Sequence, residues 1–231
     1  MKKLGLIGGV GPESTIPYYK GIVYGVQQKV GKPYFPNLTI ESLSTFEVIR
    51  MSSAGNLDGL TAYLLQGFRN LVAAGAEVGA MACNTGHLVF EALQKEVPIP
   101  LISIVETTKK EVQKQGYQKI GLIGTQATME EDFFKAPFRK AGIDVVVPQP
   151  SERTFIADHI EKELELGIVK EDTAQEVLAI TSRLAQDQQI EAIVLGCTEL
   201  PMIFTGRQAA VPVLDTMQLH IQTLVSAIME D

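Results

Sequence analysis

The two halves of this sequence repeat each other, and the repeat restricts the fold more than any other feature. Residues 4–8 (LGLIG) recur 116 residues later as 120–124 (IGLIG). The two cysteines of the chain, Cys83 and Cys197, stand 114 residues apart, and each directly follows a short apolar run. Because both features recur at nearly the same offset, the pattern indicates two homologous halves with one thiol at an equivalent position in each.

Apolar, β-branched runs alternate with longer amphipathic segments along both halves, which is typical of β-α-β units and a parallel sheet. The predicted fold is therefore α/β, with two pseudo-symmetric three-layer α/β/α domains. Strands are expected at 3–8, 38–43, 77–82, 99–104, 119–124, 143–147, 191–195 and 211–214. Helices are expected at 14–30, 57–74, 86–96, 105–115, 129–141, 152–166, 171–187 and 215–229.

The chain is expected to cross twice between these domains, since the last predicted helix follows the second half but is expected to pack on the first. This places residues 1–104 and 215–231 in the first domain and 105–214 in the second. The halves are not separated by a low-complexity linker, which favours a tight interface. Small-molecule sites are commonly built at such interfaces, so we expect the active site in the cleft between the domains.

Local signals mark several helix ends. Thr128 with Glu131 fits a capping box, in which a hydroxyl and a carboxylate satisfy free amides at a helix start. Gly75 and Gly142 follow predicted helices and suit the left-handed backbone of a helix C-terminus.

Composition excludes several classes of function. The net charge of −7, with no block of basic residues, argues against binding to nucleic acid or to an anionic membrane surface. Apolar runs stay shorter than the roughly 20 residues of a spanning helix. The apolar N-terminal stretch is interrupted at Gly11 and Pro12, unlike a secretory signal. We therefore expect a cytoplasmic protein with reduced thiols.

The two cysteines are the strongest candidates for chemistry. Ligands of parallel α/β sheets bind beyond the carboxyl ends of the strands, where both thiols are expected. A helix start after each cysteine would offer free amides to an anion and lower the thiol pKa from about 8.5. A lone cysteine is more often a buried packing residue, but two in matched positions favour a functional role. Two cysteines and three scattered histidines show no zinc-ligand spacing, so no metal is expected.

Racemisation is a reaction that uses two equivalent acid/base groups on opposite sides of one carbon. One thiolate removes the α-proton while the opposite thiol delivers a proton to the other face, and the reverse reaction exchanges their roles. The near-symmetry of the sequence fits this near-symmetry of the reaction.

Four motifs carry a resemblance to a known family: GGVGPEST at 8–15, CNTGH at 83–87, Gly124 and Thr125 with 128–130, and GCTE at 196–199. The chain resembles cofactor-independent amino-acid racemases of the aspartate/glutamate racemase superfamily over essentially its whole length. The resemblance implies catalytic Cys83 and Cys197, no pyridoxal phosphate or other cofactor, a small amino-acid substrate and a homodimer. It also implies that the substrate is bound by Asn84, Thr85, Thr125 and Thr198 and by backbone around Val10. Arg50, Ser52 and Glu199 are further candidates for substrate binding.

The sequence departs from the aspartate-specific pattern in the segment 161–167 (EKELELG), where a basic residue is expected and acids dominate. Arg50 and Lys162 are the remaining candidates to bind a side-chain carboxylate. The substrate thus stays open among acidic, polar neutral and cationic amino acids, the last facing Glu165. A hydantoin racemase, a maleate isomerase, a decarboxylase, or a redox or amino-acid sensor are the alternatives.

Other residues carry weaker signals. The glycines at 9 and 11 lack the full dinucleotide-binding spacing and are interpreted as a tight turn that lets backbone approach the substrate. His87 could tune the Cys83 thiol, or could be a partly solvated residue of a first helical turn. His159 and His220 are expected on the surface or in packing.

Overall fold

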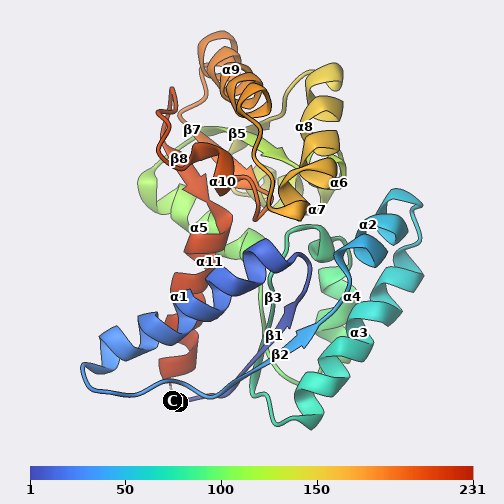
Figure 1. Ribbon diagram of the computed structural model, residues 1–231, viewed down its shortest axis with the longest axis vertical. Coiled ribbons are helices and arrows are strands. Elements are labelled where there is room, and N and C mark those ends of the chain that lie inside the picture. Colours follow the sequence, from blue (N-terminus) through green and yellow to red (C-terminus); the bar gives the residue numbers. More distant parts are fainter. Residues whose placement is uncertain (231) are drawn as a thin grey trace. The chain divides into compact units, whose positions relative to one another are not determined.

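The computed structural model describes residues 1–230 and divides the chain into two compact units. Unit 1 combines residues 1–107 with the segment that begins at Met217, and unit 2 is Thr108–Thr216. Each unit contains a four-stranded sheet in which every pair of neighbouring strands is parallel (Figure 1). The predicted α/β fold with two parallel sheets is confirmed.

The two sheets have the same strand order, which explains the sequence repeat. Unit 1 holds β1 (Leu4–Gly8), β2 (Leu38–Ser42), β3 (Val78–Met81) and β4 (Leu101–Ile102) in the order β2-β1-β3-β4. Unit 2 holds β5 (Lys119–Gly124), β6 (Asp144–Val146), β7 (Ala192–Gly196) and β8 (Val213–Asp215) in the order β6-β5-β7-β8. The repeated LGLIG and IGLIG segments are thus β1 and β5. Cys83 follows β3, which pairs with β1, and Cys197 follows β7, which pairs with β5.

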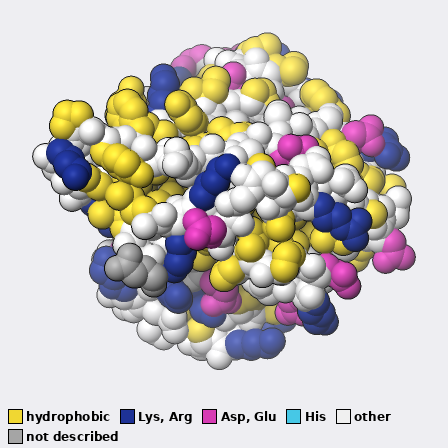
Figure 2. All heavy atoms as spheres, turned by 90° about the horizontal axis from the view of Figure 1, so that it is seen from below, with side chains coloured by type: hydrophobic (Ala, Val, Ile, Leu, Met, Phe, Trp, Pro, Cys, Tyr) yellow, Lys and Arg dark blue, Asp and Glu magenta, His cyan; other side chains and the backbone are white. Residues whose placement is uncertain are grey.

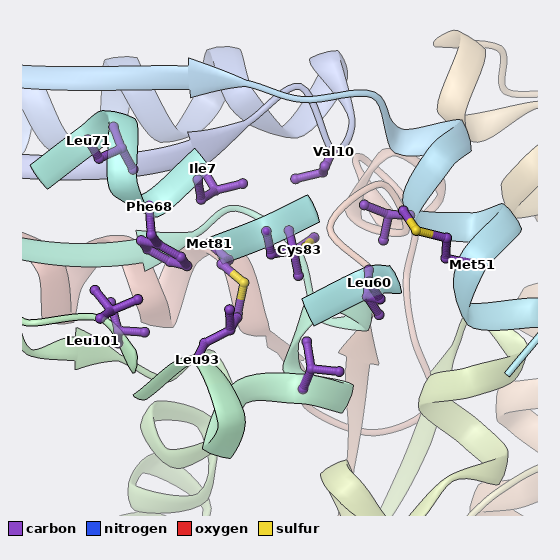
Figure 3. Close-up of a cluster of buried hydrophobic side chains, with 14 of the residues drawn as sticks. Ile7, Val10, Met51, Leu60, Phe68, Leu71, Met81, Cys83, Leu93 and Leu101 are labelled. Atoms are coloured by element: carbon purple, nitrogen blue, oxygen red, sulfur yellow. The ribbon is translucent and has the colours of Figure 1, made fainter. Parts of the chain in front are cut away.

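Helices cover both faces of the sheet in unit 1. They are α1 (Pro12–Val30), α2 (Thr45–Ser53), α3 (Leu57–Ala73), the 3-10 helix η1 (Thr85–Val89), α4 (Phe90–Glu96) and α11 (Thr216–Met229). Ile7 and Met81 point into an apolar cluster with α3 and α4 on one face (Figure 3). Leu4 and Leu6 point to the other face, against α1 and α11. This alternation gives the three predicted layers.

The C-terminal helix α11 belongs to unit 1 although unit 2 precedes it in the sequence. Two glycines of α1, Gly21 and Gly25, allow it to approach closely, because a Cβ at either position would lie 2.8 Å from Ile221 or Val225. The backbone N–H of Lys2 also donates to the carbonyl of Ile228 at 2.8 Å. The core of unit 1 is therefore completed by residues from both ends of the described chain.

Unit 2 is built on the same plan. Helix α5 (Ile104–Gln115) leads into it and is followed by α6 (Gln126–Glu130), α7 (Asp132–Lys140), α8 (Pro150–Lys162), the 3-10 helix η2 (Leu164–Leu166), α9 (Glu171–Gln188) and α10 (Pro201–Phe204). Ile193 and Leu195 of β7 pack with residues of α8 and α9. On the opposite face Leu122 and Val194 are fully buried as well.

The helix ends predicted from local sequence signals are confirmed in part. Gly75 and Gly142 have φ of +84° and +77°, which confirms the predicted helix ends. The capping box at Thr128 was wrong, because Thr125 is the N-cap of α6 and its Oγ1 accepts from the N–H of Thr128 at 3.3 Å. Helices α2 and α10 were not expected, and the helices predicted at 86–96, 129–141 and 152–166 are each divided in two.

Charges are mixed on the face of the molecule shown in Figure 2, where acidic and basic side chains lie interspersed rather than in one large patch of either sign. Within the described residues, the helices are all too short or too polar to cross a membrane.

Candidate functional site

The loop after β1 is fixed by hydroxyl groups at the start of α1. Thr15 Oγ1 accepts from the N–H of Gly9 at 2.9 Å and donates to the carbonyl of Gly11 at 2.7 Å. Gly9 has a φ of +75°, and a Cβ there would collide with the backbone of Leu43. The tight turn expected from the glycines is therefore present, and it places the buried Val10 in the same apolar cluster as Cys83.

Cys83 lies just beyond the carboxyl end of β3 and is 7% exposed. Figure 3 shows it among apolar side chains that include Val10, Met51 and Leu60. A Cβ on Gly86 would lie 3.1 Å from the Cys83 Sγ atom, so glycine allows η1 to pass close to the sulfur. The first thiol is thus buried and closely packed.

His87 is locked between two backbone groups next to this thiol. Its Nδ1 lies 3.1 Å from the Cys83 carbonyl, and its Nε2 accepts from the N–H of Ile104 at 3.2 Å. The tautomer assigned from these partners carries its proton on Nδ1. Burial, more than the nearby His220, lowers the His87 pKa to about 3. The partly solvated alternative is wrong, since His87 is only 4% exposed.

His220 is a buried packing residue that contacts the other end of the connection between β4 and α5. Tyr18 Oη donates to its Nδ1 at 2.8 Å, and its Nε2 donates to the carbonyl of Ile102 at 3.1 Å. Burial lowers the His220 pKa to about 4, so the ring is neutral. Two neutral histidines therefore hold the segment between β4 and α5, through Ile102 and Ile104.

Cys197 lies just beyond the carboxyl end of β7 and is 4% exposed. Its Sγ donates to Glu199 Oε2 at 3.0 Å, and Thr198 Oγ1 donates to the same oxygen at 2.8 Å. The thiol is therefore held in its protonated form, as a hydrogen-bond donor to a carboxylate.

The surroundings of Cys197 overturn the expectation that its thiol pKa is lowered. Burial raises this pKa well above its ordinary value, and the carboxylates of Glu199 and Glu165 raise it further. The helix that follows is too short and too distant to offset them, since α10 has four residues and begins at Pro201. The expected lowering failed because two negative charges lie where a positive helix end was predicted.

Glu165 reaches Cys197 from η2, far away in the sequence. One ligand atom each of Glu165, Cys197 and Glu199 lies within 4.8 Å of the others, and all three residues are buried. Such a group is close enough to hold a cation. Spacing of cysteines and histidines could not reveal it, because two of its members are glutamates. The sequence signal was a glutamate between Leu164 and Leu166.

The remaining substrate-binding candidates are divided among four places. Asn84 and Thr85 are buried beside Cys83, and Thr198 lies beside Cys197. Thr125 caps α6 at the end of β5, with its Oγ1 3.0 Å from that of Thr128. Ser52 lies in α2 and donates to the carbonyl of Ile49 at 3.0 Å.

The two basic candidates are engaged in surface ion pairs. Arg50 lies 2.7 Å from Glu47 on α2, with 64% of its side chain exposed. Lys162 lies 2.6 Å from Asp158 on α8, with 67% of its side chain exposed. In this arrangement both cations balance neighbouring acids on their own helices.

Two parallel sheets in repeated order, each with a buried cysteine at the end of the equivalent strand, agree with the sequence comparisons. The pattern of the Asp/Glu/Hydantoin racemase family matches residues 7–224. The chain belongs to this family, whose named members are isomerases.

Individual relatives support the same conclusion. PH1733 from Pyrococcus horikoshii OT3, described as an aspartate racemase homologue, has a solved structure that is 34% identical, with a TM-score of 0.83 and complete coverage of both chains. The broad specificity amino-acid racemase RacX of Bacillus subtilis (strain 168) is 24% identical over 96% of each chain. A glutamate racemase of Limosilactobacillus reuteri (strain DSM 20016) is 30% identical over 53% of this chain and 45% of its own.

Proposed function

We propose that this protein racemises a small α-amino acid without a cofactor, through proton transfer by Cys83 and Cys197. One thiolate takes the α-proton and becomes a thiol, and the electron pair of the broken bond stays on Cα. The other thiol then donates its proton to the opposite face and becomes a thiolate. The observation that carries the proposal is the placement of a buried cysteine after each of the equivalent strands β3 and β7, in a member of a racemase family.

The state of Cys197 suggests how the cycle begins. Its thiol donates to Glu199, and both nearby carboxylates favour the protonated form. In this proposal Cys197 starts as the proton donor, and Cys83 starts as the base. The reverse direction needs Cys197 as a thiolate, and Glu199 Oε2, at 3.0 Å, is placed to take the proton of the Cys197 thiol before that step begins.

Proton transfer alone does not account for catalysis, because the α-proton of an amino acid is weakly acidic. Acid/base groups contribute about 10²- to 10⁴-fold, so the developing charge needs oriented donors as well. We assign this role to Asn84, Thr85, Thr125 and Thr198, whose polar groups lie at the carboxyl ends of β3, β5 and β7.

The test is α-proton exchange in deuterium oxide, followed by NMR and chiral chromatography, with a panel of L- and D-amino acids. The wild-type protein should incorporate α-deuterium and interconvert the enantiomers of at least one amino acid. Racemisation by Cys83→Ser or Cys197→Ser should fall by about 10²- to 10⁴-fold. Exchange with none of the panel, or racemisation unchanged in either variant, would exclude the mechanism.

The double variant tests whether both thiols serve one reaction. A two-base mechanism needs both sulfur atoms at the same Cα, and residues that act as a unit are strongly non-additive. Cys83→Ser with Cys197→Ser should therefore lose little more activity than either single variant. Multiplicative losses, or a covalent substrate adduct on one cysteine, would instead favour chemistry with a single nucleophile.

We also propose that the protein forms a homodimer through the exposed face of α1. Helix α1 exposes Ile16, Tyr19 and Tyr24, and Phe35 packs edge-on against Tyr24 while 59% exposed. Grouped exposed hydrophobics of this kind often mark protein interfaces. Light scattering should give twice the chain mass for the wild type and the monomer mass for Tyr24→Asp. A monomeric wild type would refute this assignment.

The chemistry also favours a reducing compartment. Both cysteines are free and buried, and a disulfide would remove the thiols that the reaction needs. We propose a cytoplasmic location, which cell fractionation with immunoblotting would test.

A further inference from the structure

Three glutamates lie within five residues where α8 leads into η2, and two of them turn inward. Glu161 is exposed, whereas Glu163 and Glu165 are 5% and 7% exposed. Glutamate is almost never fully buried unless it is paired, because burial of its charge is costly. The burial of two carboxylates at one short turn must therefore be offset by specific contacts.

Glu163 is bound by the start of α9. Its Oε1 accepts from Lys170 Nζ at 3.0 Å, and its Oε2 accepts from Thr173 Oγ1 at 2.8 Å. His159 Nε2, one turn back on α8, lies 3.7 Å from Oε1. Burial raises the pKa of the Glu163 carboxyl, but the contacts with Lys170 and Thr173 outweigh it and hold that pKa below its ordinary value. Glu163 is therefore an ionised carboxylate that joins the end of α8 to the start of α9.

These contacts close the loop that carries Glu165. The backbone carbonyl of Glu163 accepts from the N–H groups of Leu166 and Ile168, both at 3.0 Å. Leu164 packs the same turn into the apolar core of unit 2. Because η2 has three residues, it depends on contacts outside itself for its stability. Glu163 supplies such contacts through both its backbone and its side chain.

Glu165 is the residue that η2 brings to the Cys197 thiol. One carboxylate oxygen each of Glu165 and Glu199 and the Cys197 sulfur all lie within 4.8 Å of one another. Glu199 follows the cysteine by two residues, whereas Glu165 arrives from the connection between α8 and α9. A carboxylate at this distance favours the protonated form of a thiol. The effect of Glu165 on Cys197 therefore depends on how η2 is held.

We propose that Glu163 is a positioning residue, which holds η2 so that the Glu165 carboxylate stays beside the Cys197 thiol. The charges that act on the thiol are those of Glu199 and Glu165, and Glu163 acts through Glu165. This inference rests on the proposed function, in which Cys197 is one of the two proton-transfer groups. It adds a residue that sets the protonation state of that group from outside its immediate surroundings.

The test is a pH titration of the Cys197 thiolate absorbance in a Cys83→Ser background. A metal chelator is present, and the variant with both cysteines replaced by serine is the blank. Glu163→Gln keeps the shape of the side chain but loses the charge that binds Lys170. The midpoint should therefore fall by about one pH unit, as expected when one of two neighbouring carboxylates moves away from a thiol. Circular dichroism at each pH shows whether the protein is folded.

The double variant with Glu165→Gln decides whether Glu163 acts through Glu165. Glu165→Gln alone should lower the midpoint by at least as much as Glu163→Gln does. Once residue 165 carries no charge, its position no longer affects the thiol in this way, so Glu163→Gln should add no further shift. A general structural role of Glu163 would instead give additive shifts.

Three further variants keep the test decisive if Glu163→Gln fails to fold. Thr173→Val removes the second contact of the Glu163 carboxylate and should also lower the midpoint. Thr173→Ser, which keeps the hydroxyl group, should match the parent protein. Glu161→Gln removes an equal charge from an exposed position two residues away and should leave the midpoint unchanged.

The possible results distinguish this inference from the proposed function, because the titration needs no substrate. An unchanged midpoint in Glu163→Gln, or in Thr173→Val if the former does not fold, would overturn the role of Glu163 and leave racemisation intact. Additive shifts, or no shift in Glu165→Gln, would overturn it as well. A lowered midpoint that depends on Glu165, in a protein that exchanges the α-proton of no amino acid, would support the positioning role and refute the racemase function.

Discussion

Glu199 Oε2 accepts a hydrogen bond from the Cys197 thiol at 3.0 Å, and this contact makes the two cysteines chemically different. The equivalent position after Cys83, two residues on, is occupied by Thr85, a neutral residue. The fold repeats, but the polar groups beside the sulfur atoms do not. The repeat therefore supplies two thiols, and their neighbours decide which one holds its proton more firmly.

Replacement of Glu199 by glutamine should make Cys197 more acidic. The Glu199 carboxylate raises the Cys197 pKa by charge and by accepting the S–H, so its neutral isostere should lower that pKa. The measurement is a pH titration of the ultraviolet thiolate absorbance in a Cys83→Ser background, where Cys197 is the remaining thiol. Glu161→Gln is the matched control, and a midpoint that is unchanged or higher in Glu199→Gln would contradict the assignment.

Replacement of Gly86 by alanine should disturb the other thiol. The new Cβ would lie 3.1 Å from the Cys83 Sγ and 3.0 Å from the Met81 Sδ, so the sulfur must shift by a few tenths of an ångström. Because small displacements of reacting groups are costly, we expect kcat to fall by about 10-fold or more.

The control for this variant is Gly67→Ala, whose Cβ would lie 2.8 Å from the apolar Ile7 and not against a thiol. Gly67→Ala should lower the midpoint of thermal unfolding yet retain the kcat of the folded protein. Equal losses of kcat in both variants would show that packing in general, and not the position of the sulfur, determines the rate.

Two buried histidines should lower the free energy of unfolding in mild acid, at pH values above those at which carboxylates titrate. The folded pKa values of His87 and His220 are lowered from 6.5 to about 3 and about 4. A lowered folded pKa means that the unfolded state binds more protons below pH 6.5, so stability is lost as the pH falls. Titration of each histidine should lower the free energy of unfolding by about 2 kcal/mol at about pH 5 relative to about pH 8.

Urea unfolding at about pH 8 and about pH 5 measures this loss. His87→Gln and His220→Gln should each be less stable at the higher pH but should show a smaller fall between the two. A wild-type unfolding free energy that stays constant or rises toward pH 5 would refute the neutral, buried state of these rings.

Tyr18 should contribute to stability through its hydroxyl group. Its Oη lies 2.8 Å from His220 Nδ1 in a buried position, so Tyr18→Phe leaves a buried acceptor unsatisfied. The expected cost is about 1 to 3 kcal/mol of unfolding free energy. Tyr34→Phe, at a position that is 36% exposed, should change it by less than about 0.5 kcal/mol. Equal effects of the two substitutions would argue against the buried hydrogen bond.

Much of the fold could be predicted because its signals are local. Apolar runs bounded by glycine indicated the strands, and Gly75 and Gly142 marked helix ends through their positive φ. Helix α2 was missed because it buries only Thr45, Val48 and Met51, which leaves a weak apolar pattern in a polar segment.

The chemistry around the thiols was less accessible from sequence. Both cysteines and their motif residues were identifiable, since the repeat and the family resemblance select them. The raised pKa of Cys197 depends on Glu165, which approaches from a different helix and whose burial is unusual for its type. The sequence gives neither the distance between Glu165 and Cys197 nor the extent of their burial. The direction of the Cys197 pKa shift could therefore be found only from the tertiary structure.

The return of α11 to unit 1 has a consequence for biosynthesis. Residues of unit 2 are contiguous and leave the ribosome before α11. Tyr18 and Ile22 of α1 are buried in a cluster that includes Leu224 and Val225 of α11, so they stay exposed until α11 has been synthesised. Because domains fold as they emerge, unit 2 can finish first, and the apolar face of α1 stays uncovered until translation reaches α11. Helix α11 is thus the one that ends the exposure of a surface prone to aggregation, although all of unit 2 is synthesised before it.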